Sequence, residues 1–471
     1  MKLPFLRTKP LNLILQAPEG GERRLKRALG PWDLVAIGIG CSIGVGIFVL
    51  PGVEAATHAG PGIILSFLIA AAVSACAALC YAELAAMIPV AGSAYTYGYA
   101  TLGEIIAWSI GWDLVLEYMV GASLVAIGWS AYLVNLLNHL MEPFGWQLSK
   151  AWCNAPFGAT PGILNVPALC IVLLLTALLV RGIRESAKVN LVMVVIKVAI
   201  ILVFIAITVW YVKPSNWKPF MPFGFSGVTT AAAIVFLAYV GFDAVSTTAE
   251  EARNPQRDMP IGIIGSLVVS TVLYVAVASI MTGVVPYTKL GVADPVALVL
   301  NTLNKPWASM LVSVGALTGI TSVLLVLLLG QPRILFAMSR DGLLPEGLAH
   351  VHPRFQTPHR TTMVTGGVVA ISAALTPIEV VAELCSIGTL FAFPIVSAGV
   401  IVLRLVRPAE RRPFRVPLFP VVPALGVVLC GYLMWRLPGI TWLRFLGWFL
   451  AGLLIYVLYG FRHSKLHQPA P

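Results

Sequence analysis

Five glycines lie in one short apolar stretch, GIGCSIGVGIFVLPG at residues 38–52. A membrane tolerates unpaired backbone groups only where the backbone is buried in protein or lines a cavity, and glycine weakens a helix. We therefore expect the helix to break near Gly44–Gly46. The free N–H groups there, and the positive end of the following half-helix, would attract an anion such as a carboxylate. The segment is a candidate substrate site.

Two other interpretations of this stretch are open. Gly40 and Gly44 form a GxxxG pattern, which lets membrane helices pack closely. The same residues with Ser42 match GxSxG, the pattern of a hydrolase nucleophile elbow. That elbow needs a preceding strand, a following helix, a histidine and an acid. Both flanks are apolar and helical in pattern, and all seven histidines fall in loops, tails or span ends (58, 139, 350, 352, 359, 463 and 467). An intramembrane enzyme that uses Ser42 is therefore a remote alternative.

Lys197 lies inside an apolar stretch, VNLVMVVIKVAI, where a charge is costly and indicates a functional site. It follows Lys188 by nine residues, so it lies about 13 Å into the span at 1.5 Å per residue. A lysine can reach back to the membrane surface over part of that depth, which is the alternative interpretation. The functional interpretation is a lysine that gains and loses a proton during transport.

Acidic residues also fall at membrane depth. Glu117 lies in the span 104–138, with Asp113 one turn before it. A carboxylate facing a cavity suits a cationic or zwitterionic substrate, and a buried partner for a basic or hydrogen-bonding group is the alternative. We expect Asp243 to hold a broken backbone by accepting N–H groups rather than to contact substrate. Glu83 and the charged residues of 250–258 are expected to form a gate or a topology anchor.

The composition is that of an integral membrane protein. The chain has 471 residues, of which 58% are hydrophobic and 11% charged, and it contains apolar runs of about the 20 residues that a spanning helix needs. We expect twelve transmembrane helices and an all-α fold, with no soluble domain. The expected spans are 31–53, 61–88, 104–138, 164–181, 188–211, 226–249, 260–285, 308–332, 361–376, 380–403, 420–436 and 440–461.

The charge distribution predicts the orientation. The net charge of +11 could suggest nucleic acid, but the basic residues lie on alternate loops. Loops and tails on the side of the termini hold 23 lysines and arginines, and the other side holds 7. The positive-inside rule therefore places both termini in the cytoplasm of a multi-pass cell-membrane protein. Residues 1–30 do not resemble a cleavable signal peptide, so the first span is expected to direct insertion.

The cysteines predict neither a disulfide framework nor a metal site. Six of the seven fall in apolar spans, and Cys153 is alone in a loop. Cys76 and Cys80 share a helix face but have no histidine or acid beside them. We expect no cofactor other than a proton as coupling ion.

A second weak helix is expected at residues 236–251, FLAYVGFDAVSTTAEE, with Gly241 at membrane depth. It lies five spans after the first. Two weak helices at matching places in two halves indicate an inverted repeat with a midplane site. We expect a 5+5 inverted repeat: the first repeat is about 31–211 and the second about 226–403. Two C-terminal helices follow at 420–461, and residues 462–471 form a cytoplasmic tail.

Four motifs, in order, resemble one known family. They are GIGCSIGVGIFVLPG, CYAELAAMIPVAGSAYTY at 80–97, VGFDAVSTTAEEARNPQRDMP at 240–260 and ILFAMSRDGLLP at 334–345. Together they resemble the amino acid/polyamine/organocation transporter superfamily, most closely its cationic amino acid transporter branch. The resemblance spans residues 28 to 460 and implies a leucine-transporter-type fold that holds an amino acid between its first and sixth helices.

The resemblance also implies site residues. Those implied to bind the carboxylate through backbone amides are Ile43, Gly44, Val45 and Gly46. Those implied to take the ammonium are backbone carbonyls near Ser42 and of Phe236, Ala238 and Val240. Lys197 matches the lysine that replaces a sodium ion in proton-coupled members. Leu237, also a candidate substrate contact, stands where the superfamily often has an aromatic residue, so the resemblance does not extend to an aromatic lid. The hydroxyl residues Thr318, Thr321 and Ser322 are also compatible with a sodium site, so composition does not exclude one.

The sequence thus predicts a secondary active transporter that imports L-amino acids, cationic, small neutral or both, by proton symport with alternating access. An exchanger or sodium-coupled carrier of the same fold is the first alternative. A channel is disfavoured because no ring of repeated filter residues is visible. The expected partners are the amino acid and the lipid bilayer but not nucleic acid, and a small membrane partner is left open.

Overall fold

The computed structural model describes residues 7–10, 25, 27–141, 144–145, 147–156, 162–292, 295–376, 378–435 and 439–466. Most of the expected N-terminal segment 1–30, residues 467–471 of the expected tail and the Val45 side chain lie outside the described part. The described chain is helical, and its one β-bridge pairs Leu29 with Ala252. The predicted all-α class is confirmed.

The helices of the first half follow the hydropathy pattern. They are α2 (Pro31–Ser42), α3 (Val45–Phe48), α4 (Leu50–Glu54), α5 (Ile63–Met87), α6 (Ala94–Thr101), α7 (Glu104–Met141), α8 (Val166–Arg181) and α9 (Ile183–Thr208). Prolines lie in the first turn of α2 and α8, where the missing N–H costs nothing.

The second half continues in the same way. Its helices are α10 (Gly224–Val235), α11 (Phe242–Thr247), α12 (Pro255–Val284), α13 (Pro295–Thr302), α14 (Pro306–Arg340), α15 (His359–Leu375), α16 (Ile378–Val406), α17 (Val421–Trp435), α18 (Gly439–Ile455) and α19 (Phe461–His463). Helix α14 continues to Arg340, past the expected end at residue 332, and Pro332 lies inside it. Membrane helices tolerate such prolines where neighbours satisfy the freed backbone.

Eight helical segments of the described chain are long and apolar enough to cross a membrane. They are Leu50–Met87, Glu104–Asn138, Ser186–Tyr211, Gly224–Thr247, Pro255–Val284, Pro306–Arg340, Ile387–Val406 and Gly439–His463, and Val166–Arg181 and Val421–Trp435 are shorter apolar helices. The first expected span, 31–53, is divided: α2 and α3 are too short to span, and α4 forms the start of the segment Leu50–Met87. The count of twelve spans stays a prediction.

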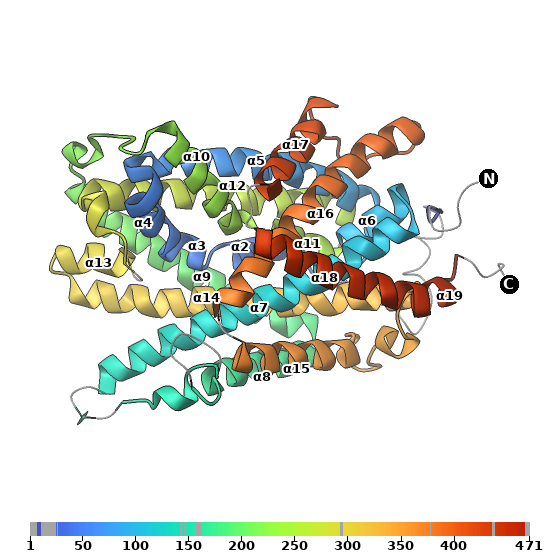
Figure 1. Cartoon of the computed structure of the whole chain (residues 1–471), viewed down its shortest axis with the longest axis horizontal. Coiled ribbons are helices and arrows are strands. Elements are labelled where there is room, and N and C mark those ends of the chain that lie inside the picture. Colours follow the sequence, from blue (N-terminus) through green and yellow to red (C-terminus); the bar gives the residue numbers. More distant parts are fainter. Residues whose placement is uncertain are drawn as a thin grey trace.

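The helices pack as one bundle elongated along the direction of most of its long helices (Figure 1). Helix α12 packs against α2 and α5, α14 packs against α7 and α9, and α16 packs against α7 and α17. Helices α8 and α15 pack together beside α7. The two breaks lie inside this bundle, where α2 packs against α9, α11, α12 and α14.

The described residues nearest the two termini lie at the same end of the molecule (Figure 1). The Lys9 ammonium donates to the Asp341 carboxylate at 2.5 Å, and the Lys465 backbone N–H donates to the Asp341 carbonyl at 3.2 Å. Asp341 directly follows α14, so the two tails meet at one end of this long helix.

Candidate substrate and coupling site

The first predicted helix break is present. Helix α2 ends at Ser42, Ile43 is extended with φ −83° and ψ 98°, and the chain becomes helical again at Val45. The packing at these glycines is close: an added Cβ at Gly40 would lie 2.5 Å from Asn190 Oδ1, and one at Gly44 would lie 2.8 Å from Val323 Cγ2. The Ser42 hydroxyl donates to the Gly38 carbonyl at 3.0 Å, within its own helix.

The second predicted break is also present. Helix α10 ends at Val235, a 3-10 turn covers Phe236–Tyr239, and α11 begins at Phe242. Gly241 has φ 132°, a conformation that side chains disfavour. An added Cβ at Gly241 would lie 2.7 Å from the Cβ of Cys41, which belongs to α2. The two breaks therefore lie directly against each other.

Tyr274, on α12, ties the two breaks together. Its hydroxyl lies 2.7 Å from the Ser42 carbonyl oxygen and 2.8 Å from the Ala238 carbonyl oxygen. Beside the same hydroxyl, an added Cβ at Gly46 would lie 2.5 Å from the Ala238 Cβ and 3.6 Å from the Tyr274 hydroxyl oxygen. Sequence reasoning missed Tyr274, because a tyrosine in an apolar span gives no sign of which helix its hydroxyl contacts.

Lys197, on α9, is fully buried at the first break. Its ammonium nitrogen lies 3.0 Å from the Ile39 and Gly40 carbonyl oxygens and 2.7 Å from the Ile43 carbonyl oxygen. It also lies 2.7 Å from the Ser322 hydroxyl oxygen, on α14. An ammonium has three N–H donors, so these oxygens satisfy all of them. The lysine does not reach back to the membrane surface but links the broken helix to α14.

The three hydroxyls considered for a sodium site have different hydrogen-bond partners. Ser322 contacts Lys197 and also donates to the Gly40 carbonyl at 3.0 Å. Thr321 accepts a hydrogen bond from the Trp129 indole at 2.8 Å, and Thr318 donates within its own helix to Gly315. Of the three, only Ser322 has a hydrogen bond with Lys197.

Asp243 holds the second break, as expected. One carboxylate oxygen accepts the Gly241 backbone N–H at 3.0 Å, and the other accepts the Tyr118 hydroxyl at 2.9 Å. Because the Gly241 N–H has no helical partner at the break, the carboxylate satisfies a group that the membrane would otherwise penalise.

Glu117 and Asp113 face α16. One Glu117 carboxylate oxygen accepts the Thr389 hydroxyl at 2.6 Å. The other Glu117 oxygen and both Asp113 oxygens are buried and have no hydrogen-bond partner among the described residues. An added Cβ at Gly388 would lie 3.2 Å from Asp113 Oδ1, so this glycine leaves room for the acids.

A cavity of about 330 Å³ reaches the second break. It is lined by Thr229, Thr230, Ala233, Ile234, Phe236, Leu237, Val240, Thr389, Leu390, Tyr432 and Leu433. The candidates Phe236, Leu237 and Val240 line it, but Ser42 and residues 43–46 do not. Glu117 does not line it either, but its carboxylate accepts a hydrogen bond from Thr389, which does.

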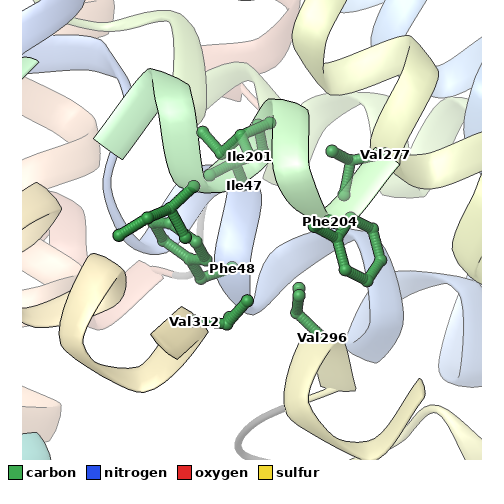
Figure 2. A pocket seen from close by; sticks show the side chains of 8 residues that line it. Ile47, Phe48, Ile201, Phe204, Val277, Val296 and Val312 are labelled. Carbon is green, nitrogen blue, oxygen red and sulfur yellow. The ribbon is translucent and has the colours of Figure 1, made fainter. Parts of the chain in front are cut away.

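A second cavity, of about 10 Å³, lies beyond the first break. Figure 2 shows that apolar side chains of Ile47, Phe48 and neighbouring helices surround it. That volume is about the minimum for one water molecule, and the lining offers no polar side chain to hold one. It is therefore too small for a substrate.

Buried ion pairs join helices near the end where the termini lie. The Glu251 carboxylate binds the Arg333 guanidinium through two hydrogen bonds of 2.8 and 2.9 Å. Glu250 accepts a hydrogen bond from Arg340 at 2.7 Å, and Glu83 pairs with Arg404. The acids were expected in a gate or anchor, but their arginine partners could not be assigned from sequence.

The predicted cluster at 250–258 does not act as one unit. The Arg253 backbone N–H donates to Leu29, and the Asp258 carboxylate accepts the Asn254 backbone N–H at the start of α12. These two residues thus fix the chain between α11 and α12, whereas Glu250 and Glu251 tie α14 to that segment.

Comparison with known proteins gives the family. The amino acid permease family model matches residues 29–459. A methylthioribose transporter of Bacillus subtilis is 48% identical over 98% of this chain and 99% of its own length. A branched-chain amino acid permease of the same organism is 49% identical over 99% of this chain and 100% of its own length. The vacuolar cationic amino acid transporter 4 of Arabidopsis thaliana is 36% identical over 86% of this chain and 68% of its own length.

These relatives are named as transporters and permeases, and the protein is not an enzyme. The matched region includes both helix breaks, Lys197 and the cavity. The chain belongs to the amino acid permease family and is a multi-pass membrane transporter.

Proposed function

We propose that the protein is a secondary active transporter that carries L-amino acids into the cell by proton symport with alternating access. The observation that carries the proposal is the position of the Lys197 ammonium, within 3.0 Å of three carbonyl oxygens of the broken helix and of the Ser322 hydroxyl. A change in protonation there would alter the link between the first break and α14. Protonation of Lys197 would in this way be coupled to the proposed substrate site at the first break.

The position of Lys197 also favours a proton over sodium as the coupling ion. Carbonyl and hydroxyl oxygens suit a small hard cation, and the Lys197 ammonium takes that position among the oxygens. Removing the charge requires loss of a proton, whereas a sodium ion would have to displace the ammonium. A sodium-coupled carrier or an exchanger of the same fold is the alternative.

The substrate site is proposed at the two breaks. Residues Ile43 to Gly46 would bind the carboxylate through backbone amides, and carbonyls near Ser42 and of Phe236, Ala238 and Val240 would take the ammonium. Contact between the breaks through Gly46 and Ala238 supports a shared site. Because the Tyr274 hydroxyl already bonds to the Ser42 and Ala238 oxygens, substrate would share those acceptors with Tyr274.

Alternating access needs one side open while the other is closed. The 330 Å³ cavity runs beside α10 from Thr229, which is exposed, to Val240 at the break. The pairs Glu251–Arg333 and Glu250–Arg340 join α14 to the chain after α11 at the other end. This arrangement supports a site reached from outside and closed toward the cytoplasm.

The proposal includes twelve spans, a 5+5 inverted repeat with two added helices, and cytoplasmic termini. The position of both tails at Asp341 supports an even number of crossings. The two breaks, each deep in the bundle, support the repeat. The cell membrane is the expected location.

Uptake by the purified protein in proteoliposomes tests the proposal. Labelled leucine, alanine and arginine are offered with and without an inward proton gradient, and again with an inward sodium gradient. We expect accumulation only with the proton gradient. Accumulation that needs sodium would favour a sodium-coupled carrier instead. Uptake that needs amino acid inside the vesicle would favour an exchanger.

A further inference from the structure

Two polar side chains of α9 bind the inner half-helix α2. Asn190 precedes Lys197 by seven residues, which is about two helical turns or 10 Å, so both lie on one face of α9. The Asn190 side-chain N–H donates to the Ala36 carbonyl oxygen at 3.0 Å, and Lys197 contacts three carbonyl oxygens further along α2. We propose that Asn190 is a positioning residue of the transport cycle, whose amide holds α2 against α9 and closes the cytoplasmic side of Lys197. The inference rests on the proposed alternating access.

The order of the contacts along the two helices places Asn190 on the cytoplasmic side. Asn190 precedes Lys197 in α9, and Ala36 precedes Ile39 in α2, so the Asn190 bond lies nearer the expected cytoplasmic end than every Lys197 bond. Asn190 is 2% exposed, whereas Lys188, two residues earlier, is exposed. Separation of the helices at Asn190 would let water from the cytoplasm reach the ammonium, and proton release from Lys197 needs such access.

Gly40 allows the close approach of α2 to Asn190. The three atoms nearest to an added Cβ at Gly40 all belong to the Asn190 amide, with Oδ1 at 2.5 Å, Nδ2 at 2.9 Å and Cγ at 3.1 Å. Gly38 faces α12 instead, where an added Cβ would lie 2.3 Å from the Ser266 hydroxyl oxygen. Helix α2 therefore fits between α9 and α12 without room for a methyl group at either glycine, and the Asn190 amide sets its distance from α9.

The hydrogen bonding of Asn190 suits a contact that has to break during transport. Its bond to Ala36 is neutral, so it does not depend on whether Lys197 carries a proton. Its Oδ1 is buried and finds no hydrogen-bond partner in the part of the chain that the structure describes. A buried unpaired oxygen raises the free energy of the closed arrangement, and water would satisfy it once α2 moves away. The bond gained and the bond lacking keep the two arrangements close in free energy, as alternating access requires.

Labelling of Cys41 measures the position of α2. This cysteine is 6% exposed and faces the second break, where an added Cβ at Gly241 would lie 3.0 Å from its sulfur. The other six cysteines are replaced by alanine, and a membrane-impermeant maleimide is applied to inside-out vesicles. Asn190→Ala should raise the labelling rate at least about fivefold, the factor for one hydrogen bond of ordinary net strength. An unchanged rate would overturn the inference.

Asn216→Ala is the matched control. The Asn216 side-chain N–H also donates to a backbone carbonyl, that of Gly283 at 2.8 Å, but this bond lies beyond the other end of α9 and does not involve α2. The control should therefore leave the labelling of Cys41 unchanged. A rise equal to that in Asn190→Ala would show a general loosening of the bundle and would contradict the assignment.

Gly40→Ala tests the same contact from α2, and it also gives a result if Asn190→Ala does not fold. The added methyl group should push α2 away from the Asn190 amide and raise the labelling of Cys41. In the double variant the methyl group occupies space that the amide has left, so labelling should be no faster than in Asn190→Ala. Increases that multiply in the double variant would show that the two residues act independently, against the inference.

Transport separates this inference from the proposed function. Asn190→Ala should lower the leucine accumulation reached with an inward proton gradient several-fold, because protons would leak past a loosened α2, while exchange of labelled for unlabelled leucine continues. Normal accumulation in this variant would contradict the inference and leave the proposed function standing. A wild-type protein that does not use the proton gradient would contradict the proposed function, and the labelling of Cys41 would still decide the role of Asn190.

Discussion

At the scale of single residues, Lys197 is the buried cation at the first break. Its ammonium is surrounded by oxygens of Ile39, Gly40, Ile43 and Ser322 and is fully buried. Methionine has a similar length and no charge. The Lys197→Met variant should therefore lose accumulation driven by an inward proton gradient while exchange of labelled for unlabelled amino acid survives.

The control for this variant is Lys213→Met, because Lys213 is exposed beyond α9 and should leave both activities unchanged. Both variants are measured in the same vesicles with and without a pH gradient. Gradient-driven accumulation that persists in Lys197→Met would rule out the lysine as the coupling group.

Gly46 is the second residue with a defined spatial requirement. A methyl group there would lie 2.5 Å from the Ala238 Cβ and 3.0 Å from its backbone Cα, so the two breaks would have to separate. Gly46→Ala should lower the affinity for amino acid strongly. The fold should survive, because the rest of α3 and α10 is unchanged.

Thermal stabilisation by added leucine measures this binding, since a ligand that binds the folded state raises its melting temperature. Gly447→Ala is the matched control, because nothing lies within 4 Å of an added Cβ at that glycine of α18. An unchanged ligand-induced shift in folded Gly46→Ala would remove this glycine from the site.

At the scale of elements, the ion pair Glu251–Arg333 joins α14 to the segment that follows α11. Both side chains are buried, at 0% and 3% exposure, so removal of one partner leaves an uncompensated charge that costs about 3–5 kcal/mol. Arg333→Met and Glu251→Gln should each lower the melting temperature. The double variant should melt higher than Arg333→Met alone, because it has no unpaired carboxylate.

The exposed pair Lys465–Glu346 provides the control. Its charged atoms are 3.8 Å apart and its side chains are 46% and 65% exposed, and such surface pairs contribute little. Lys465→Met should therefore leave the melting temperature nearly unchanged. A double variant at Glu251 and Arg333 whose losses simply add would show that the pair is not coupled.

At the scale of the whole molecule, both tails meet Asp341, where Lys9 and Lys465 contact the same residue. An even number of spans and the excess of basic residues on that side then predict cytoplasmic termini. A fluorescent protein fused to either terminus should fluoresce in a Gram-negative host, and alkaline phosphatase fused there should be inactive.

A phosphatase fusion after Lys213, in a loop expected outside, should be active and serves as the control. Activity of phosphatase at only one terminus would require an odd number of spans. Activity at both termini would reverse the orientation and place the basic loops outside.

The sequence by itself determined the features that depend on local chemistry. Hydropathy predicted the helical class. Glycines at membrane depth predicted breaks near Gly44–Gly46 and Gly241, and the structure has them after Ser42 and Val235, because backbone freedom and unpaired N–H groups are local properties. The depth of Lys197 likewise predicted a buried charge. The desolvation cost of a charge depends on its distance from the membrane surface, which can be counted along a helix.

Only the tertiary structure decided which groups meet. Ser322 with Lys197, Tyr274 with Ser42 and Arg333 with Glu251 are separated by 125, 232 and 82 residues. Thr389 was not singled out in the sequence, yet it lines the cavity and donates a hydrogen bond to Glu117. Such pairings depend on how each helix is rotated and packed against its neighbours, and nearly uniformly apolar spans carry too weak a periodic signal to fix that rotation.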